Sequence, residues 1–272
     1  MGTYDDDLRL AHVLADAVER PTLEAFRGPG QEVWVKDDGA LGCGTAVRAE
    51  ELLRAQLQRT RPRDAVQGEE LPPTGHGGRR WVLDPIDGTA SFVRGVPVWA
   101  TLLALLVDDV PVLGLVSAPA LGRRWWAATG SGAWTGRTLS RARAVRVSDT
   151  SVVEHAVASY SSLAVWLAHP RREGFLRLAD RCWRTRGYGD FWSHALVAEG
   201  AVDLALDVGT ALHDIAALHA LVTEAGGRLS DLDGVDGPFG GSALSTNGVL
   251  HDAALSLLND GAEAPWSQVP QG

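Results

Sequence analysis

A series of strand-like segments in the first half of the chain constrains the fold more than any other feature of the sequence. Residues 98–107, 110–117 and 124–129 are apolar runs of strand length, and Asp108-Asp109 between the first two is a signal for a hairpin turn. A shorter apolar segment, 81–83, precedes them. These runs predict a β-sheet whose strands follow one another in the chain.

Helical patterns flank these strands. Apolar residues recur at helical spacing in segments 8–26 and 48–57, with a polar, glycine-rich turn or short hairpin at 36–44 between them. We also expect helices at 171–181, 191–199 and 214–225, strands at 156–160 and 202–207, a loop at 72–78, and a turn with an edge element at 130–136. The sequence therefore predicts a mixed α/β fold of two parts, residues 1–135 and 136–272, that share one site.

Net charge and hydropathy argue against some classes of partner. The formal net charge is −9 and the sequence pI is about 5.3, which disfavours broad attraction to nucleic acid or to an anionic membrane. The longest apolar run, residues 98–107, is too short to span a bilayer, and the acidic N-terminus lacks the apolar core of a signal peptide. Cys43 and Cys182 are too few for a disulfide framework or a four-ligand zinc site. We therefore expect a cytoplasmic protein.

The loop after segment 81–83 carries two carboxylates in a tight turn. It reads Asp-Pro-Ile-Asp-Gly-Thr at residues 84–89, and its proline and glycine favour a turn. Such a turn can bring Asp84 and Asp87 to one point and leave the backbone carbonyl of Ile86 facing the same way. Carboxylate and carbonyl oxygens are the ligands that Mg²⁺ prefers. The loop therefore predicts a magnesium site.

Other residues extend this site toward a phosphate. Gly88 and Thr89 offer backbone N–H groups, and Thr89 a hydroxyl, to a phosphate oxygen near a helix start. Glu69 is a further carboxylate that belongs with Asp84 and Asp87. Asp214 could complete a second metal site, and two ions would activate a water for in-line attack on phosphorus. Each piece alone is compatible with ordinary turn chemistry or a solvated surface, but their combination favours metal-assisted hydrolysis of a phosphate monoester.

These motifs resemble those of the inositol monophosphatase superfamily, which comprises Mg²⁺-dependent phosphatases. The matching segments are Gly-Glu-Glu at 68–70, the Trp-to-Phe motif at 81–92, Asp-Ile-Ala-Ala at 214–217 and Glu-Ala-Gly-Gly at 224–227. The resemblance implies an αβαβα sandwich, two or three Mg²⁺ ions and a homodimer. It implies that the metal ligands are Glu69, Asp84, Asp87, Asp214 and the Ile86 carbonyl. It also implies that Gly88 and Thr89 bind the phosphate, and that Thr89, Glu69 and Asp87 have catalytic roles.

Within the superfamily, the chain is most similar to the actinobacterial histidinol-phosphate phosphatases. Segments 92–100, 116–120, 124–128 and 196–203 carry this similarity, together with Tyr-Gly-Asp-Phe at 188–191. The resemblance implies a small phosphorylated metabolite as the substrate, with histidinol phosphate as the leading candidate. It places Asp190, Asp207, Gly189 and His213 at the alcohol part of the substrate. Two acidic positions there suit a cationic or hydroxyl-rich leaving group, although Asp207 could instead cap a turn and Asp190 could be solvated.

The chain departs from the family pattern beside the metal loop. Where the family carries a threonine and an aspartate ahead of a helix glutamate, this sequence has Cys43 and Ala46. In the family that aspartate supports the threonine equivalent to Thr89 in activating the attacking water, so its absence predicts a slower reaction. Asp37, Asp38 or Glu70 could substitute for it. Two milder departures are Ser91 and His213, which replace an asparagine and a tryptophan of the motifs.

These departures leave two alternative functions open. One is a phosphatase of a nucleoside monophosphate or another small phosphate in specialised, antibiotic-type biosynthesis. The other is a catalytically weakened metal-binding homologue with a scaffold or regulatory role. The second alternative is disfavoured, because crowded carboxylates repel one another and have no physical use without a cation.

Overall fold

Two helices and a large sheet form the first part of the protein. The computed structural model describes residues 2–28, 30, 32–37 and 39–260. Helices α1 (Asp5–Arg27) and α2 (Gly44–Thr60) lie where the helical patterns predicted them, and the hairpin of β1 (Val33–Val35) and β2 (Leu41–Cys43) lies between them. Three aspartates in the first turn of α1 favour the start of this helix, because carboxylates stabilise the positive end of the helix dipole.

The predicted run of consecutive strands forms a seven-stranded sheet of order β3-β4-β5-β6-β7-β8-β9. Its strands are β3 (Ala65–Gly68), β4 (Arg79–Asp87), β5 (Ala100–Val107), β6 (Val110–Ala118), β7 (Arg123–Ala128), β8 (Ala133–Gly136) and β9 (Ala142–Val145). Asp108 and Asp109 have φ values of 50° and 63°, as a tight β5–β6 hairpin turn requires. The predicted hairpin is confirmed.

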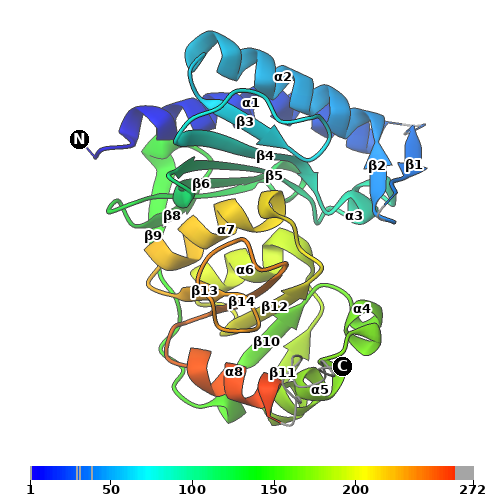
Figure 1. The fold of residues 1–272 in the computed structure, drawn as a ribbon, viewed down its shortest axis with the longest axis vertical. Helices are drawn as coiled ribbons and strands as arrows, with labels where there is room; N and C mark the ends of the chain where they lie inside the picture. The colour runs from blue at the N-terminus through cyan, green and yellow to red at the C-terminus, as the bar shows by residue number, and fades with distance from the viewer. Residues whose placement is uncertain (1, 29, 31, 38, 261–272) are drawn as a thin grey trace, which may run out of the picture.

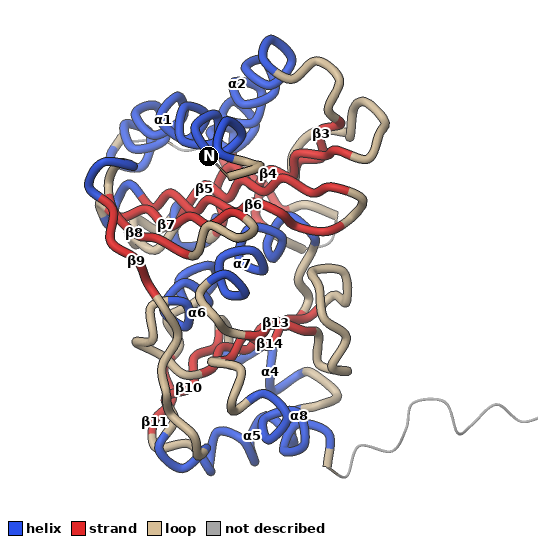
Figure 2. The backbone as a smooth tube through the Cα atoms, turned by 90° about the vertical axis from the view of Figure 1, so that its left-hand side faces the viewer, coloured by secondary structure: helices blue, strands red, loops and turns tan. Residues whose placement is uncertain are grey.

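The predicted edge position of the 130–136 segment is wrong. Strand β8 pairs with β7 on one side and with β9 on the other, so β9 is the edge strand of the sheet. The basic stretch that contains β9 gave no alternating apolar pattern, because an edge strand need not bury both faces. The first sheet therefore continues past residue 135 to Val145, and a long loop then leads to the second sheet (Figure 2).

The second part is built on a five-stranded sheet of order β11-β10-β12-β14-β13. Its strands are β10 (Val157–Tyr160), β11 (Arg184–Arg186), β12 (Leu204–Val208), β13 (Arg228–Ser230) and β14 (Ser242–Thr246). Its helices are α4 (Leu163–Ala168), α5 (Arg172–Arg181), α6 (Asp190–Ala198), α7 (Leu212–Glu224) and α8 (His251–Asn259). Short 3₁₀ helices occur at η1 (Pro119–Leu121), η2 (Leu139–Arg141) and η3 (Val153–His155).

The elements stack in five layers (Figure 1). Helices α1 and α2 cover one face of the first sheet, α6 and α7 lie between the two sheets, and α4, α5 and α8 cover the far face of the second sheet. Trp125 and Trp126 alternate across β7, so one packs toward α7 and the other toward α1. The predicted αβαβα sandwich is confirmed. Because α6 and α7 lie between the sheets, their N-termini can meet the end of β4.

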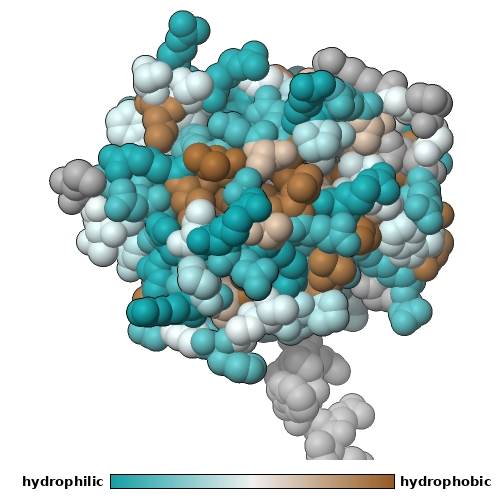
Figure 3. All heavy atoms as spheres, turned by 90° about the horizontal axis from the view of Figure 1, so that it is seen from above, coloured by the Kyte–Doolittle hydropathy of each residue, from teal (hydrophilic) through white to brown (hydrophobic). Residues whose placement is uncertain are grey.

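The surface on the side of α1 and α2 is mostly hydrophilic, with hydrophobic side chains near its centre (Figure 3). Val13 of α1 and Leu52 of α2 are exposed. Single exposed apolar residues are common on protein surfaces. Among the described residues, no helix has the length and hydropathy that crossing a membrane requires.

Candidate active site

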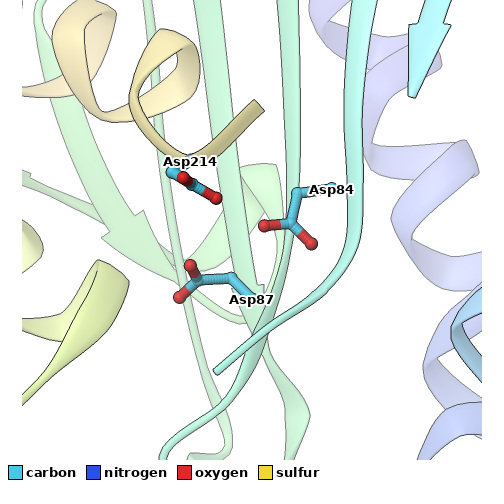
Figure 4. A group of neighbouring side chains, drawn as sticks. All are labelled: Asp84, Asp87 and Asp214. Carbon is cyan, nitrogen blue, oxygen red and sulfur yellow. The ribbon is translucent and has the colours of Figure 1, made fainter. Parts of the chain in front are cut away.

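Three aspartates converge where β4 ends and α7 begins. Asp84 and Asp87 come from β4 and Asp214 from the first turn of α7, and one carboxylate oxygen of each lies within 4.8 Å of the others. Their side chains point toward one another (Figure 4). The predicted convergence of Asp84 and Asp87 is confirmed as geometry, and Asp214 joins them from a position far away in the sequence.

A β-bulge puts the two strand aspartates on the same side. Residues three apart in a regular strand point to opposite faces of the sheet. Here Asp84 pairs with Leu102 and Asp87 with Ala100, so the register shifts by one residue between them. The extra residue turns Asp87 back to the side of Asp84. Gly88 then takes a φ of 78°, which favours glycine.

Backbone N–H groups hold each of the three carboxylates. Asp84 accepts a hydrogen bond from its own loop at Ile86 N (3.0 Å), and Asp87 accepts one from Phe191 N at the start of α6 (2.9 Å). Asp214 accepts one from Ala211 N (2.6 Å), which fixes it at the N-terminus of α7. The orientation of each carboxylate is therefore set by main-chain geometry.

The carboxylates form an unfavourable group without a cation. Burial and the nearby charges of Glu69, Asp87 and Asp214 raise the pKa of Asp84 well above its ordinary value. Burial also raises the pKa of Asp87 and of Asp214, and neighbouring carboxylates add to both shifts. Clustered hard oxygen donors that disfavour their own ionisation are what a bound Mg²⁺ stabilises. The donor set therefore fits Mg²⁺.

A cavity of about 400 Å³ opens beside the three aspartates. Seven predicted site residues line it: Glu69, Asp87, Gly88, Thr89, Asp190, Asp207 and Asp214. Asp84 lies beneath the cavity, almost fully buried. Gly189 precedes Asp190 at the start of α6 but does not line the cavity, and neither does His213, whose Nε2 is 3.4 Å from a carboxylate oxygen of Asp214.

The sequence matches the model of the inositol monophosphatase family over residues 43–263. This match includes the β4 loop and the start of α7, which together form the three-aspartate group. The chain belongs to the inositol monophosphatase family. Within this family of Mg²⁺-dependent enzymes, it is a phosphomonoesterase.

Two family members resemble the chain over nearly its full length. The histidinol-phosphatase of Streptomyces coelicolor is 52% identical over 263 residues, which cover 95% of this chain and 99% of that protein. The histidinol-phosphatase of Mycobacterium tuberculosis is 49% identical, with 94% of this chain and 99% of that protein covered. An inositol monophosphatase structure from Zymomonas mobilis has a TM-score of 0.82 at 29% identity, covering 95% of this chain and all (100%) of that one. The chain therefore spans nearly the full length of these three relatives.

Glu69 lies outside the three-aspartate group of this inositol monophosphatase-family protein. Its Oε1 accepts a hydrogen bond from Lys36 Nζ at 2.6 Å, and the same ammonium donates to Glu70 at 3.0 Å. Lys36 thus supplies a positive charge at the edge of the site, and its pKa is raised by the two glutamates although burial opposes the shift. The role of Glu69 as a metal ligand stays a prediction.

Thr89 has no carboxylate partner among the described residues. Its hydroxyl donates to the Ile86 carbonyl at 2.9 Å, so the predicted water-orienting group is bonded to a predicted metal ligand. Ala46 and Cys43 are buried in an apolar cluster with Ile86, Phe92 and Trp99. Burial also raises the pKa of the Cys43 thiol, in agreement with its interpretation as a small buried residue.

Two of the proposed substitutes for the missing aspartate, Asp37 and Glu70, do not take its place beside Thr89. Asp37 is exposed and is not among the residues that line the cavity, and Asp38 lies outside the described residues. Glu70 is bonded to Lys36, and burial raises its pKa. Neither Asp37 nor Glu70 has a hydrogen bond to Thr89 among the described residues.

Two further aspartates, Asp190 and Asp207, line the cavity. Burial raises the pKa of Asp207 to about 7, although hydrogen bonds from the Ser161 hydroxyl and from Val208 N oppose the shift. Asp190 begins α6 with a φ of 45°, and burial followed by the charge of Asp214 raises its pKa. Asp190 and Asp207 therefore add two carboxylates to the cavity that Asp87 and Asp214 line.

Sequence reasoning missed His194, which also lines the cavity. Its Nδ1 lies 2.7 Å from Ser245 Oγ, and its buried Nε2 has no hydrogen-bond partner among the described residues. Burial lowers the pKa of this imidazole to about 4, so the ring is neutral. Its position four residues after Asp190 on one helix was the signal that could have found it, because such residues share a face.

Proposed function

We propose that this protein is a Mg²⁺-dependent histidinol-phosphatase. The observation that carries the proposal is the three-aspartate group beside a cavity that Asp190 and Asp207 also line. The three aspartates suit a metal-bound phosphate, and Asp190 and Asp207 suit an alcohol that carries an ammonium group. Histidinol phosphate is such an amino alcohol ester, and the two histidinol-phosphatases described above match nearly the whole chain.

The residues that would bind the metal ions and the phosphate have separate roles in this proposal. Asp84, Asp87 and Asp214, with Glu69 and the Ile86 carbonyl, would hold two or three Mg²⁺ ions. When bound, the ions supply Lewis acidity, which lowers the pKa of a water and neutralises charge on the phosphate. Backbone N–H groups of Gly88 and Thr89 bind phosphate oxygens, since they lie at the start of α3 (Thr89–Val93). The Thr89 hydroxyl orients the attacking water.

A second set of residues would recognise the alcohol part of the substrate. Asp207 and Asp190 would bind the ammonium group of the substrate, with Gly189 and His213 beside them. A bound cation favours the ionised form of Asp207, whose pKa of about 7 leaves it partly protonated at neutral pH. Asp207 therefore contributes to binding more than to the chemical step.

Replacement of Asp207 by asparagine tests this role. We expect KM for histidinol phosphate to rise by about tenfold to a hundredfold, the usual worth of a hydrogen bond to a charged group, with little change in kcat. KM for glycerol 2-phosphate, which has no ammonium group, should stay within about twofold. Steady-state phosphate release measures both. An equal rise in KM for the two substrates would show that Asp207 does not bind the ammonium group.

The substrate itself is tested with a panel of phosphate esters. Purified protein with Mg²⁺ should release phosphate from histidinol phosphate faster than from inositol 1-phosphate or nucleoside 5′-monophosphates. The departures at Ala46, Ser91 and His213 favour nucleoside monophosphates as the second candidate. Turnover confined to nucleotides would replace the histidinol assignment, and no turnover with any ester would support the scaffold alternative.

Metal binding should stabilise the protein in a pH-dependent way. The raised pKa values of the buried aspartates mean that the native state binds more protons than the unfolded state. The free energy of unfolding of the metal-free protein therefore falls as pH rises. The contribution of Asp207 is lost between its unfolded pKa of 3.8 and its folded pKa of about 7. Mg²⁺ requires ionised carboxylates, so at saturation it should raise Tm by about 5 °C or more at pH 8 and by less at pH 5.5. Thermal unfolding at both pH values measures this, and a larger shift at pH 5.5 would contradict it.

Three further predictions belong to the same proposal. They are a homodimer, a cytoplasmic location, and a division of the chain into residues 1–135 and 136–272. Strand β9 belongs to the first sheet, which favours a division after Val145.

A further inference from the structure

A glutamate of α2 is completely buried beneath the segment that carries Glu69. Glu50 has no exposed surface, and its Oε1 accepts a hydrogen bond from Arg54 Nε at 2.7 Å, one turn further along the helix. Its Oε2 accepts one from the backbone N–H of Glu70, also at 2.7 Å. A buried carboxylate is costly to desolvate unless such partners compensate it. This position is therefore tolerated only because both oxygens are bonded.

Arg54 binds the same segment further along. Its Nη2 donates to the Leu71 carbonyl at 3.0 Å and its Nη1 to the Thr74 hydroxyl at 3.2 Å. Glu50 thus accepts one hydrogen bond from residues 70–74, and Arg54 donates two hydrogen bonds to them. We call these two side chains the α2 clamp.

Gly68 shows how closely the segment lies against the clamp. A Cβ atom at this position would lie 2.0 Å from Glu50 Oε1 and 2.4 Å from Oε2. Gly68 is in strand β3, where residues of any type adopt the backbone conformation, so space is what requires glycine here. The carboxylate is not free to move aside, because Arg54 and the Glu70 N–H hold it.

The clamp reaches the active site through one residue. Glu69 lies between Gly68 and Glu70, both of which contact Glu50, and its own N–H donates to the Leu83 carbonyl of β4 at 3.2 Å. Leu83 directly precedes Asp84. The backbone of Glu69 is therefore fixed between α2 and β4, and its side chain enters the cavity that Asp214 also lines.

We propose that Glu50 is a positioning residue that, with Arg54, places Glu69 for Mg²⁺ binding. The proposal rests on the proposed function, since it assigns a metal to this cavity. Outer-shell groups that orient metal ligands typically change metal affinity by about 10-fold to 100-fold when they are replaced. Because Glu50 does not line the cavity, its effect is transmitted through the main chain at Gly68 and Glu70.

A double-mutant cycle on Glu50 and Gly68 tests the clamp. Mg²⁺ affinity of Glu50→Ala, Gly68→Ala and the double variant is measured by calorimetry without substrate. We expect each single variant to bind Mg²⁺ about 10-fold to 100-fold more weakly. The double variant should bind no more weakly than Glu50→Ala, because the alanine at 68 then has no carboxylate to displace.

Glu51→Ala is the matched control, since Glu51 is the exposed neighbour of Glu50 on the same helix. Its Mg²⁺ affinity should equal that of the wild type. Urea unfolding checks that each variant is folded, and Glu50→Ser, which also removes the atoms next to Gly68, replaces Glu50→Ala if the latter is not. Additive losses in the double variant, or single variants with Mg²⁺ affinity within about twofold of the wild type, overturn the proposal.

The outcome also separates this proposal from the proposed function. Mg²⁺ binding that depends on the clamp, in a protein that releases no phosphate from any ester, supports the clamp and refutes the phosphatase assignment. A wild-type protein that does not bind Mg²⁺ overturns both. Phosphate release with normal Mg²⁺ affinity in Glu50→Ala overturns the clamp alone.

Discussion

Replacement of Asp87 by asparagine is expected to reduce phosphate release by about a thousandfold or more. Asp87 is one of the three carboxylates within 4.8 Å of one another, and a metal ion supplies several kcal/mol of charge stabilisation to the transition state. Asparagine keeps the shape of the side chain and an oxygen for the Phe191 N–H, so the fold should persist. Steady-state release from histidinol phosphate with saturating Mg²⁺ measures the loss.

The same variant should be more stable than the wild type when metal is absent. Burial and neighbouring aspartates raise the pKa of Asp87, so its ionised form costs free energy at neutral pH. Asparagine removes that charge, and urea unfolding at pH 8 with a chelator should show a higher midpoint. Asp149→Asn, at an exposed position in the loop after β9, is the control and should change neither quantity. An Asp87→Asn variant with more than a tenth of wild-type activity would contradict the proposed metal site.

Replacement of Ala46 by aspartate is expected to raise kcat, by up to about 100-fold. The family uses an aspartate at this position to support its catalytic threonine, and here the Thr89 hydroxyl donates to the Ile86 carbonyl instead. A carboxylate at position 46 would offer Thr89 a basic acceptor and free that carbonyl. The pH dependence of kcat should then show a new acidic limb that the wild type lacks.

This gain should be accompanied by lower stability. Ala46 is fully buried among Cys43, Phe92 and Trp99, and a carboxylate in an apolar cluster loses its hydration. The indole Nε1 of Trp99 is a buried donor without a partner among the described residues, which gives the new carboxylate one compensating group in that cluster. Ala46→Asn, similar in size but not basic, should be no faster than the wild type. A folded Ala46→Asp protein with unchanged or lower kcat would mean that the absence of a carboxylate at position 46 does not limit the rate.

Local sequence patterns were enough for the elements that are regular and buried. The apolar runs of β5 and β6 and the two aspartates between them predicted their hairpin, because side-chain alternation and turn chemistry are local properties. Strand β9 and strand β14 were not predicted, since their short segments have no strong period and acquire strand structure by pairing with β8 and with β12. Pairing between distant segments leaves no mark in either segment alone.

The parts of the site that depend on local sequence were predictable, and the parts that depend on contacts between distant segments were not. The spacing of Asp84 and Asp87 predicted a shared point, and the bulge in β4 is the physical means by which they meet. Asp214 could be offered from the residues only as a further carboxylate at a helix start, and the family resemblance supported its place in the site, because nothing local relates α7 to β4. The contact of Lys36 with Glu69 and the burial of His194 beside the cavity depend on tertiary packing, which sequence spacing does not encode.

In the proposed function, Asp84, Asp87 and Asp214 together hold divalent cations. Anomalous diffraction from crystals grown with Mn²⁺, which takes oxygen ligands like those of Mg²⁺, tests this directly. We expect anomalous peaks between the three carboxylates, one of them in contact with oxygens of Asp84 and Asp87. Full Mn²⁺ soaking that gives no peak there, or peaks only elsewhere on the protein, would contradict it.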